Sequence, residues 1–205
     1  TDFIDIALAG LAGEDDIATV TIIANQLVTA VEFYSFPSKR DSARLKVGNA
    51  FEVMLANAKA GSDHQLQFAR NFTSFASSAE HNDLIKELLA GKLAGLKVDA
   101  DLRWTFVIAL SERGLMDKES LAAELLKDNT LTGQLAHATC LAALPTAEAK
   151  AETWKSLTTA EISTSLREAQ IAGFQRPLHR PLLAAYVDPY FDLLMDTWGK
   201  KSYEV

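Results

Sequence analysis

The sequence has very little cysteine, because Cys140 is the one thiol among 205 residues. An intramolecular disulfide is therefore excluded, and a lone thiol fits a reducing compartment. Long apolar runs are also missing, since none approaches the roughly 20 residues of a membrane span. The opening segment TDFIDIALAG lacks the basic start of a signal peptide. These absences predict a soluble, cytoplasmic protein without a membrane partner.

Positive charge is scarce as well. Lysine and arginine number 20 against 27 acidic residues, which gives a formal net charge of -7. Such a balance argues against sequence-independent binding to nucleic acid or to anionic lipid. The length allows a hydrophobic core, and no segment has the composition of a linker. We therefore expect one domain over residues 1–205, with no nucleic acid as partner.

Motifs that carry chemistry are absent from this chain. No histidine is followed by glutamate, so there is no H-E-x-x-H zinc motif, and glycine-rich phosphate loops and G-x-S-x-G elbows are also missing. We expect neither catalytic nor metal-ligating residues here. The histidines are His64, His81, His137 and His179.

Two weaker candidates have simpler structural interpretations. The segment AEHND, residues 79–83, offers Glu80, His81 and Asp83 as metal ligands, but adjacent residues on a helix point in different directions. A solvated, capped helix start is the favoured interpretation. Cys140 follows His137 by one helical turn, which would make a nucleophile and base only beside a pocket with a third, orienting group. A small buried cysteine is favoured instead.

Apolar residues follow the helical period along the chain, and no segment is a convincing strand. The first expected helix follows GEDD and includes Ile17 to Val31. The apolar run from Trp104 to Leu110 predicts an internal helix. Asp117 is expected to cap the next helix, and Asp188 before Pro189 to cap the last. Other helices are expected after Pro37 up to Gly61, over 63–76, over 82–91 and between the later prolines.

The helices are arranged as a degenerate repeat. Four leucines recur in similar contexts at intervals of about 31 to 36 residues, at Leu66, Leu102, Leu135 and Leu166. This period is typical of helical pairs that bury their apolar faces by stacking on neighbouring pairs. We therefore predict an all-α fold, a right-handed superhelix of HEAT-like antiparallel helix pairs (an α-solenoid). An ordinary helical bundle is the alternative.

Basic residues gather at three junctions of this acidic chain, in PSKRDSAR, LRW and FQRPLHRP. Arg103, Arg176 and Arg180 are candidates for recognition, because a guanidinium can bind a carboxylate through two donors. Alternatively, these arginines satisfy carbonyls at helix ends and pair with the surplus of acidic residues.

Three segments carry a resemblance to a known family: AVEFYSFPSKR, DADLRW and AGFQRPLHRPLLAAYVDPYFDLLMDTW. They resemble the C-terminal helical domain of zinc aminopeptidases of the aminopeptidase N type, especially the actinobacterial branch. The resemblance implies a helical superhelix that closes over an active site in an upstream, thermolysin-like catalytic domain. The family's H-E-x-x-H and G-x-M-E-N motifs have no counterpart here, because Met54, Met116 and Met195 are not followed by glutamate.

The resemblance also implies a role. The parent would remove amino-terminal residues from peptides with zinc held in its catalytic domain, while this C-terminal segment, without catalytic residues or metal, would shape the substrate chamber. Arg103, Arg176 and Arg180 would then contact the carboxyl end of the peptide. The chain departs from the family pattern at Leu178 to Arg180 and at Ala185, which weakens the transfer of ligand contacts. A free-standing HEAT-like scaffold that binds another protein is the alternative.

The end of the chain carries an aromatic stripe, which includes Tyr186, Tyr190, Phe191, Leu194, Met195 and Trp198. Such a stripe must be covered. We expect residues 184–198 to pack on the preceding hairpin and partly on a missing helix or a neighbouring domain. On this interpretation the chain is a C-terminal fragment of a longer aminopeptidase.

Overall fold

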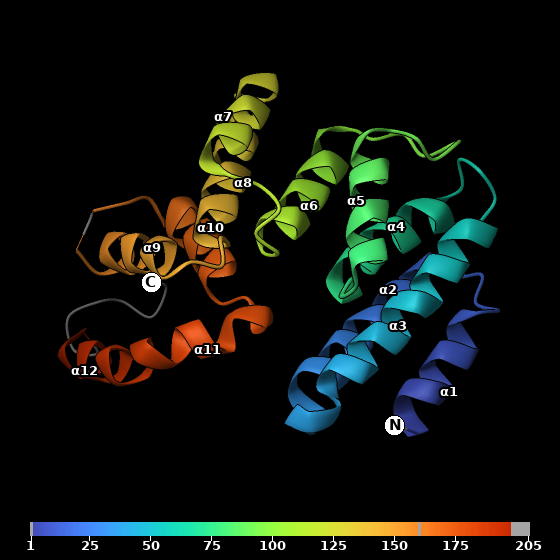
Figure 1. Cartoon of the computed structure of the whole chain (residues 1–205), viewed down its shortest axis with the longest axis horizontal. Coiled ribbons are helices and arrows are strands. Elements are labelled where there is room, and N and C mark those ends of the chain that lie inside the picture. Colours follow the sequence, from blue (N-terminus) through green and yellow to red (C-terminus); the bar gives the residue numbers. More distant parts are fainter. Residues whose placement is uncertain (1, 160, 198–205) are drawn as a thin grey trace. The chain divides into compact units, whose positions relative to one another are not determined.

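The described part of the chain is helical throughout. The computed structural model describes residues 2–159 and 161–197, with side chains as far as 194, and none of these residues forms a strand (Figure 1). The chain divides into two compact units, residues 1–109 and 110–205, and α6 (Ala100–Ser111) spans the division. The predicted all-α class is confirmed. Its right-handed sense and the single domain over 1–205 stay predictions.

The first unit begins with a helix that the sequence analysis missed. Its α1 buries Ile4, Ala7 and Leu11, which share one face at helical spacing, so our prediction that the first helix starts at Ile17 was wrong. That apolar spacing was present in a segment considered only as a possible signal peptide. The helices of this unit before α6 are α1 (Asp2–Leu11), α2 (Ile17–Thr29), the π-helical turn η1 (Ala30–Tyr34), α3 (Pro37–Asn57), α4 (Asp63–Phe75) and α5 (Ala79–Leu89).

Phenylalanines form the core of the first unit. Phe51 of α3 stacks on Phe75 of α4 with ring centroids 5.5 Å apart, and the ring of Phe68 lies 6.2 Å from that of Phe51. Helix α4 packs on both α3 and α2. The expected central position of Trp104 is confirmed as far as burial goes, since its side chain is only 5% exposed.

Residues 17–34 are long and apolar enough to cross a membrane by length and composition, with a mean hydropathy of 1.3. This differs from our expectation that no apolar run approaches that length. Core helices and amino-terminal signal sequences pass the same test, and 28% of this segment is buried within the first unit, including Val20, Ala24, Leu27 and Val31.

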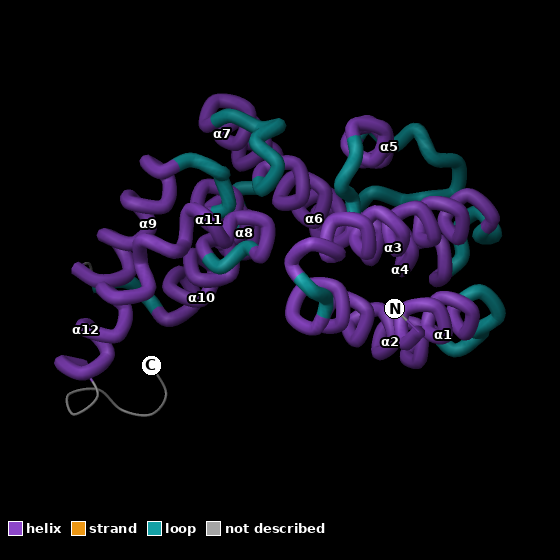
Figure 2. Tube along the Cα trace, turned by 60° about the horizontal axis from the view of Figure 1, so that its bottom comes forward, coloured by secondary structure: helices purple, strands orange, loops and turns teal. Residues whose placement is uncertain are grey.

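The second unit is built around α8. This helix packs along α10 and also contacts α7 and α9, and Figure 2 shows the loops that join these helices. The elements after α6 are α7 (Lys118–Lys127), α8 (Leu131–Ala142), α9 (Ala147–Thr159), α10 (Thr164–Phe174), the 3-10 turn η2 (Pro177–His179), α11 (Arg180–Leu183), the 3-10 turn η3 (Ala184–Tyr186) and α12 (Val187–Thr197).

The leucine repeat marks every second helix. Leu66, Leu102, Leu135 and Leu166 lie near the starts of α4, α6, α8 and α10. Within each unit a helix packs on the next but one along the chain, α2 on α4 and α8 on α10. Contacts between alternate helices are typical of stacked helical pairs, so the arrangement fits the predicted α-solenoid.

One of the two predicted aspartate caps is confirmed. The Asp117 carboxylate accepts the backbone N–H of Ser120 at 2.8 Å and begins α7. Asp188 does not cap α12, which already starts at Val187 because the turn η3 runs directly into it. The cap prediction there was wrong.

The aromatic stripe at the chain end is covered in part. Tyr186 contacts Trp154 of α9 and Phe174 of α10, at centroid distances of 5.3 and 5.2 Å, which confirms packing on the preceding hairpin. Tyr190 and Phe191 are exposed within this unit. The side chain of Met195 and all of Trp198 lie outside the described residues.

Candidate functional site: the arginines at the helix junctions

The three predicted arginines fall in two places. Arg103 lies on α6 in the first unit, where it is half-buried and has interaction partners. Arg176 and Arg180 lie in the second unit on either side of the turn η2. The structure therefore brings Arg176 and Arg180 into one short segment, and Arg103 belongs to the other unit.

Arg180 is engaged locally. Its Nη1 donates to the carbonyl of Pro177 at 3.1 Å, across the turn that separates it from Arg176. A guanidinium that satisfies a carbonyl beside a helix start fits the structural interpretation of this residue.

Arg176 shares a carboxylate with a neighbouring arginine. Its Nε lies 3.4 Å from Glu112 Oε2, while Arg113 Nη1 donates to Glu112 Oε1 at 2.6 Å. The side chains of Arg113 and Glu112 are buried, whereas that of Arg176 is 27% exposed. Nε of Arg176 is buried without a hydrogen-bond partner. Of the two guanidiniums, that of Arg176 is the more loosely held and the more accessible.

His179 is buried between the same elements. Its Nε2 donates to the backbone carbonyl of Glu112 at 2.7 Å, which leaves Nδ1 as a buried acceptor without a partner. Burial lowers the pKa of His179 below its ordinary value. The backbone hydrogen bond and the charge of Glu112 oppose this change, while the charges of Lys150 and Arg176 add to it. The imidazole is therefore neutral at physiological pH.

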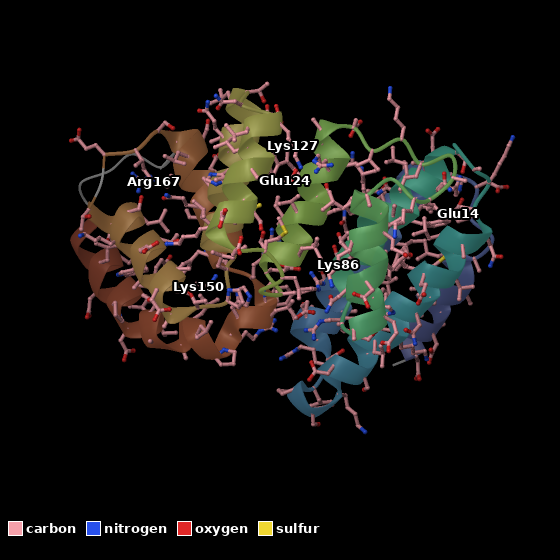
Figure 3. All side chains as sticks on the ribbon, turned by 45° about the horizontal axis from the view of Figure 1, so that its top comes forward. Glu14, Lys86, Glu124, Lys127, Lys150 and Arg167 are labelled. Atoms are coloured by element: carbon pink, nitrogen blue, oxygen red, sulfur yellow. The ribbon has the colours of Figure 1, made fainter. Side chains whose placement is uncertain are left out.

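Lys150 completes this cluster and was missed by the sequence analysis. It lies on α9 inside the second unit, where Figure 3 labels it, and its side chain is fully buried. Its Nζ donates to the carbonyl of Ala142 at 2.6 Å, of Phe174 at 3.3 Å and of Gly173 at 3.4 Å. Burial, followed by the charge of Arg176, lowers the pKa of Lys150 to about 8, and Glu112 opposes the change.

The carbonyls that Lys150 binds belong to the C-terminal ends of α8 and α10. Such ends carry partial negative charge and leave carbonyls unsatisfied, so an ammonium is well suited to them. The ends lie close together because Gly173 has no side chain: a Cβ there would lie 2.2 Å from the carbonyl oxygen of Thr139. A signal for Lys150 existed, since it shares a helix face with Thr153, Trp154 and Leu157 at helical spacing.

The remaining basic junction supports the structural interpretation. Arg44 binds the buried carboxylate of Glu32, with Nε 2.9 Å and Nη2 2.8 Å from Oε1, and its Nη1 also binds Asp41 at 2.9 Å. Arg40 donates to the carbonyl of Ser35 at 3.4 Å. These contacts hold η1 against the start of α3.

His81 is buried, which contradicts part of our interpretation of AEHND. The ring packs edge-on against Phe72 at 5.1 Å, its Nδ1 accepts the N–H of Ser77, and Ser78 rather than a carboxylate caps α5. The segment is a capped helix start, as expected, but its histidine belongs to the core. No three described His, Cys, Asp or Glu residues are grouped so that they could hold a metal ion.

Cys140 is a core residue, as expected. Its side chain is fully buried, and burial raises the pKa of the thiol to about 12, so the reactive thiolate does not form at neutral pH.

Two open cavities lie in other parts of the structure. One of about 1200 Å³ lies among α1, α2, η1 and α3, and one of about 390 Å³ is lined by aromatic residues of α9, α10 and α12. Neither includes Arg103, Arg176 or Arg180 in its lining.

Helices that pack on the next but one along the chain define a protein built from stacked helical pairs. Comparison with known proteins identifies the family: residues 1–205 match the model of the ERAP1-like C-terminal domain, and the chain belongs to this family. The chain is also 39% identical, over 207 aligned residues, to aminopeptidase N of Streptomyces lividans. All of this chain is aligned, but it spans only 24% of the length of that relative.

Proposed function

We propose that the chain is the C-terminal domain of a zinc metallo-aminopeptidase of the aminopeptidase N type, which removes amino-terminal residues from peptides in the cytoplasm. The family match over residues 1–205 carries this proposal, and the 39% identity to about a quarter of an aminopeptidase N supports it. The zinc ion belongs to the upstream catalytic domain, where it activates the attacking water.

The role of this chain is to close over and shape the chamber that holds the peptide. Helical repeats suit that role, because stacked pairs build extended surfaces without a catalytic group of their own. A peptide whose amino terminus lies at the zinc site directs its carboxyl end away from it, toward the helical domain. Nucleic acid and membranes are not partners in this proposal.

Arg176 is the strongest of the three proposed contacts for the peptide carboxylate. It is part-exposed and shares its one carboxylate partner with Arg113. Arg180 already donates to the Pro177 carbonyl, and Arg103 also has interaction partners. We keep all three as candidates and rank Arg176 first.

The parent reading frame provides the first test. An H-E-x-x-H and a G-x-M-E-N encoded upstream of Thr1 are expected. A start codon immediately before Thr1, with neither motif upstream, would favour the free-standing scaffold instead.

Assays of the isolated chain provide the second test. The purified 205-residue chain is expected to fold as a helical unit, to bind no stoichiometric zinc and to leave an aminoacyl reporter intact, whereas the full-length enzyme hydrolyses it. Circular dichroism checks the folding, and metal analysis checks the zinc content. Chelator-sensitive hydrolysis by the isolated chain would contradict the proposal.

A further inference from the structure

The buried charge of Lys150 has no counter-ion within the described residues. Its Nζ is bonded to three backbone carbonyls and forms no ion pair with a described carboxylate. Carbonyl dipoles stabilise an ammonium only partly, because a buried charge without a paired charge retains a large desolvation cost. Lys150 is therefore a buried cation that remains incompletely compensated.

The side chains around Lys150 add to the imbalance. We use the name Lys150 cluster for Glu112, Arg113, Lys150, Arg176 and His179. Lys150 and Arg176 are two cations of this cluster, Glu112 is the carboxylate that contacts both Arg113 and Arg176, and His179 is neutral. The charges of Lys150 and Arg176 therefore act on each other in a largely buried setting, where screening is weak.

Arg176 is the member of the cluster through which an anion can reach this charge. It is the most exposed of the cationic side chains, and its Nε is a buried donor without a hydrogen-bond partner. It also affects both titratable neighbours, since its charge lowers the pKa of Lys150 and of His179. An anion paired with Arg176 would cancel this effect on both groups.

We propose that the carboxylate which binds at Arg176 also compensates the buried charge of Lys150, so that ligand binding at this site is coupled to proton uptake by Lys150. This inference rests on the proposed function, in which that carboxylate is the carboxyl end of a peptide. The inference adds Lys150 to the site. Lys150 does not contact the ligand directly and acts through Arg176. By linkage, a carboxylate that favours the charged lysine binds more tightly at pH values where the lysine is charged.

The charges facing Lys150 fix the direction of this pH dependence. Glu112 follows α6, Arg176 and His179 follow α10, and Lys150 itself lies on α9. Burial and Arg176 lower the pKa of Lys150 to about 8, and Glu112 raises it. Neutralising Arg176 should move the pKa of Lys150 back toward its ordinary value, because the charge of Arg176 is one of the causes that lower it. Affinity should therefore fall as the pH rises from 7 to 9.5, by roughly tenfold if the pKa changes by about one unit.

The experiment uses the 205-residue chain and acetylated trialanine as probe, as the free acid and as the amide. Calorimetry at pH 8.5 in two buffers of different ionisation enthalpy measures proton uptake, and carbon-detected NMR of Lys150 Cε measures its titration. We expect the acid to bind more tightly than the amide, with uptake of about half a proton for a shift of about one pKa unit. The titration midpoint of Lys150 should rise when the acid is bound.

Two variants of α9 provide the comparison. Lys150→Met should abolish proton uptake and flatten the pH dependence of affinity, while Lys155→Met, an exposed lysine of the same helix, should change neither. Because Lys150→Met leaves three carbonyls unpaired and can unfold, the Lys150 titration in the wild-type chain is the decisive measurement. If the acid binds in an Arg176-dependent way without moving that titration, the coupling is wrong and the proposed function stands. If acid and amide bind equally, the carboxylate contact and the coupling both fail.

Discussion

Trp104 shows how far a single residue can be predicted from sequence. The apolar run around it indicated an internal helix, and the indole is almost fully buried. Burial of a large ring depends on local composition, because a helix that is apolar nearly all round must be covered on several sides. The prediction succeeded since the signal lay in adjacent residues.

Trp104→Ala should lower the free energy of unfolding by about 3 to 5 kcal/mol, because the truncation removes a large buried ring and leaves a cavity. Chemical denaturation followed by circular dichroism measures this change. Leu126→Ala is the control: Leu126 is 84% exposed, so its truncation should change stability by less than about 0.5 kcal/mol. Equal midpoints for the Trp104 variant and the wild type would show that the indole does not contribute to the core.

Lys150 illustrates a burial that the sequence indicates only through helical spacing, since the residue shares a helix face with Trp154 and Leu157. Helix α9 is rich in alanine and charged residues, so its lysine looks like an exposed one. Its burial results from the close approach of α8 and α10 at Gly173, a contact between helices well separated in sequence. The positions of Arg176 and Arg180 at a junction were predictable from the surrounding prolines, whereas the Glu112 contact of Arg176 depends on the fold.

The charge on Lys150 should make stability depend on pH. The pKa of Lys150 is about 8 in the folded chain and ordinarily 10.5, so between these values the unfolded state binds more protons. The free energy of unfolding contributed by this group therefore rises with pH across the interval, by roughly 2 to 3 kcal/mol in all.

Urea denaturation at several pH values from 7.5 to 10.5, for wild type and Lys150→Met, measures this contribution. The comparison is needed because Cys140 acts in the opposite direction: its pKa is raised to about 12 in the fold, so it loses stability as the unfolded thiol ionises. The difference between the two proteins should shift in favour of wild type as the pH rises. Parallel pH profiles would show that Lys150 titrates normally.

Helix ends mark the limit of prediction at the level of the element. Asp117 and Asp188 both preceded an apolar helical pattern, and the sequence offered the same cap for each. The structure separates them, since Asp117 binds the Ser120 N–H while Asp188 lies inside a helix that begins before it. The 3-10 turn η3, which continues directly into α12, left no signal in the sequence.

Asp117→Ala should therefore lower the unfolding temperature through loss of the N-cap, and Asp188→Ala should change it less. The Asp117 effect should weaken in acid. Hydrogen bonds from Ser120 lower the pKa of Asp117, so its contribution is present above the ordinary pKa of 3.8 and is lost as the pH falls through the folded value. Thermal unfolding at pH 7 and at pH 3 checks both statements, and equal losses for the two variants would refute the cap assignment.

At the scale of the whole molecule, the role proposed for the cationic junctions depends on the aminopeptidase of which we propose this chain is a domain. The fold class and the repeat were predictable because helical periodicity and the leucine spacing extend along the chain. Which junctions serve a ligand was not predictable, because a guanidinium satisfying a helix end and one binding a substrate look alike in sequence. Arg44 and Arg180 have structural contacts, and Arg176 is the part-exposed arginine of the Lys150 cluster.

Arg176→Ala in the full-length enzyme should raise KM several-fold for a free-acid peptide and leave kcat nearly unchanged. A charge-assisted pair in a chamber partly shielded from water contributes about 1.5 to 3 kcal/mol, whereas an exposed pair contributes less than about 1 kcal/mol. The side chain of Arg176 is part-exposed, so its contribution should lie between these values. The same peptide with an amidated end, and a single-residue reporter, have no carboxylate to lose and should be hydrolysed as by the wild type.

Arg167→Ala is the matched control, because Arg167 is a half-buried arginine of the same unit that donates to the carbonyl of Leu157 at 2.8 Å. It should affect stability without separating the three substrates. Arg103→Ala and Arg180→Ala complete the series, and we expect smaller effects on the free-acid peptide because both side chains already have partners. Equal changes on all three substrates for Arg176→Ala would assign the residue to structure, as a counter-ion of Glu112 alone.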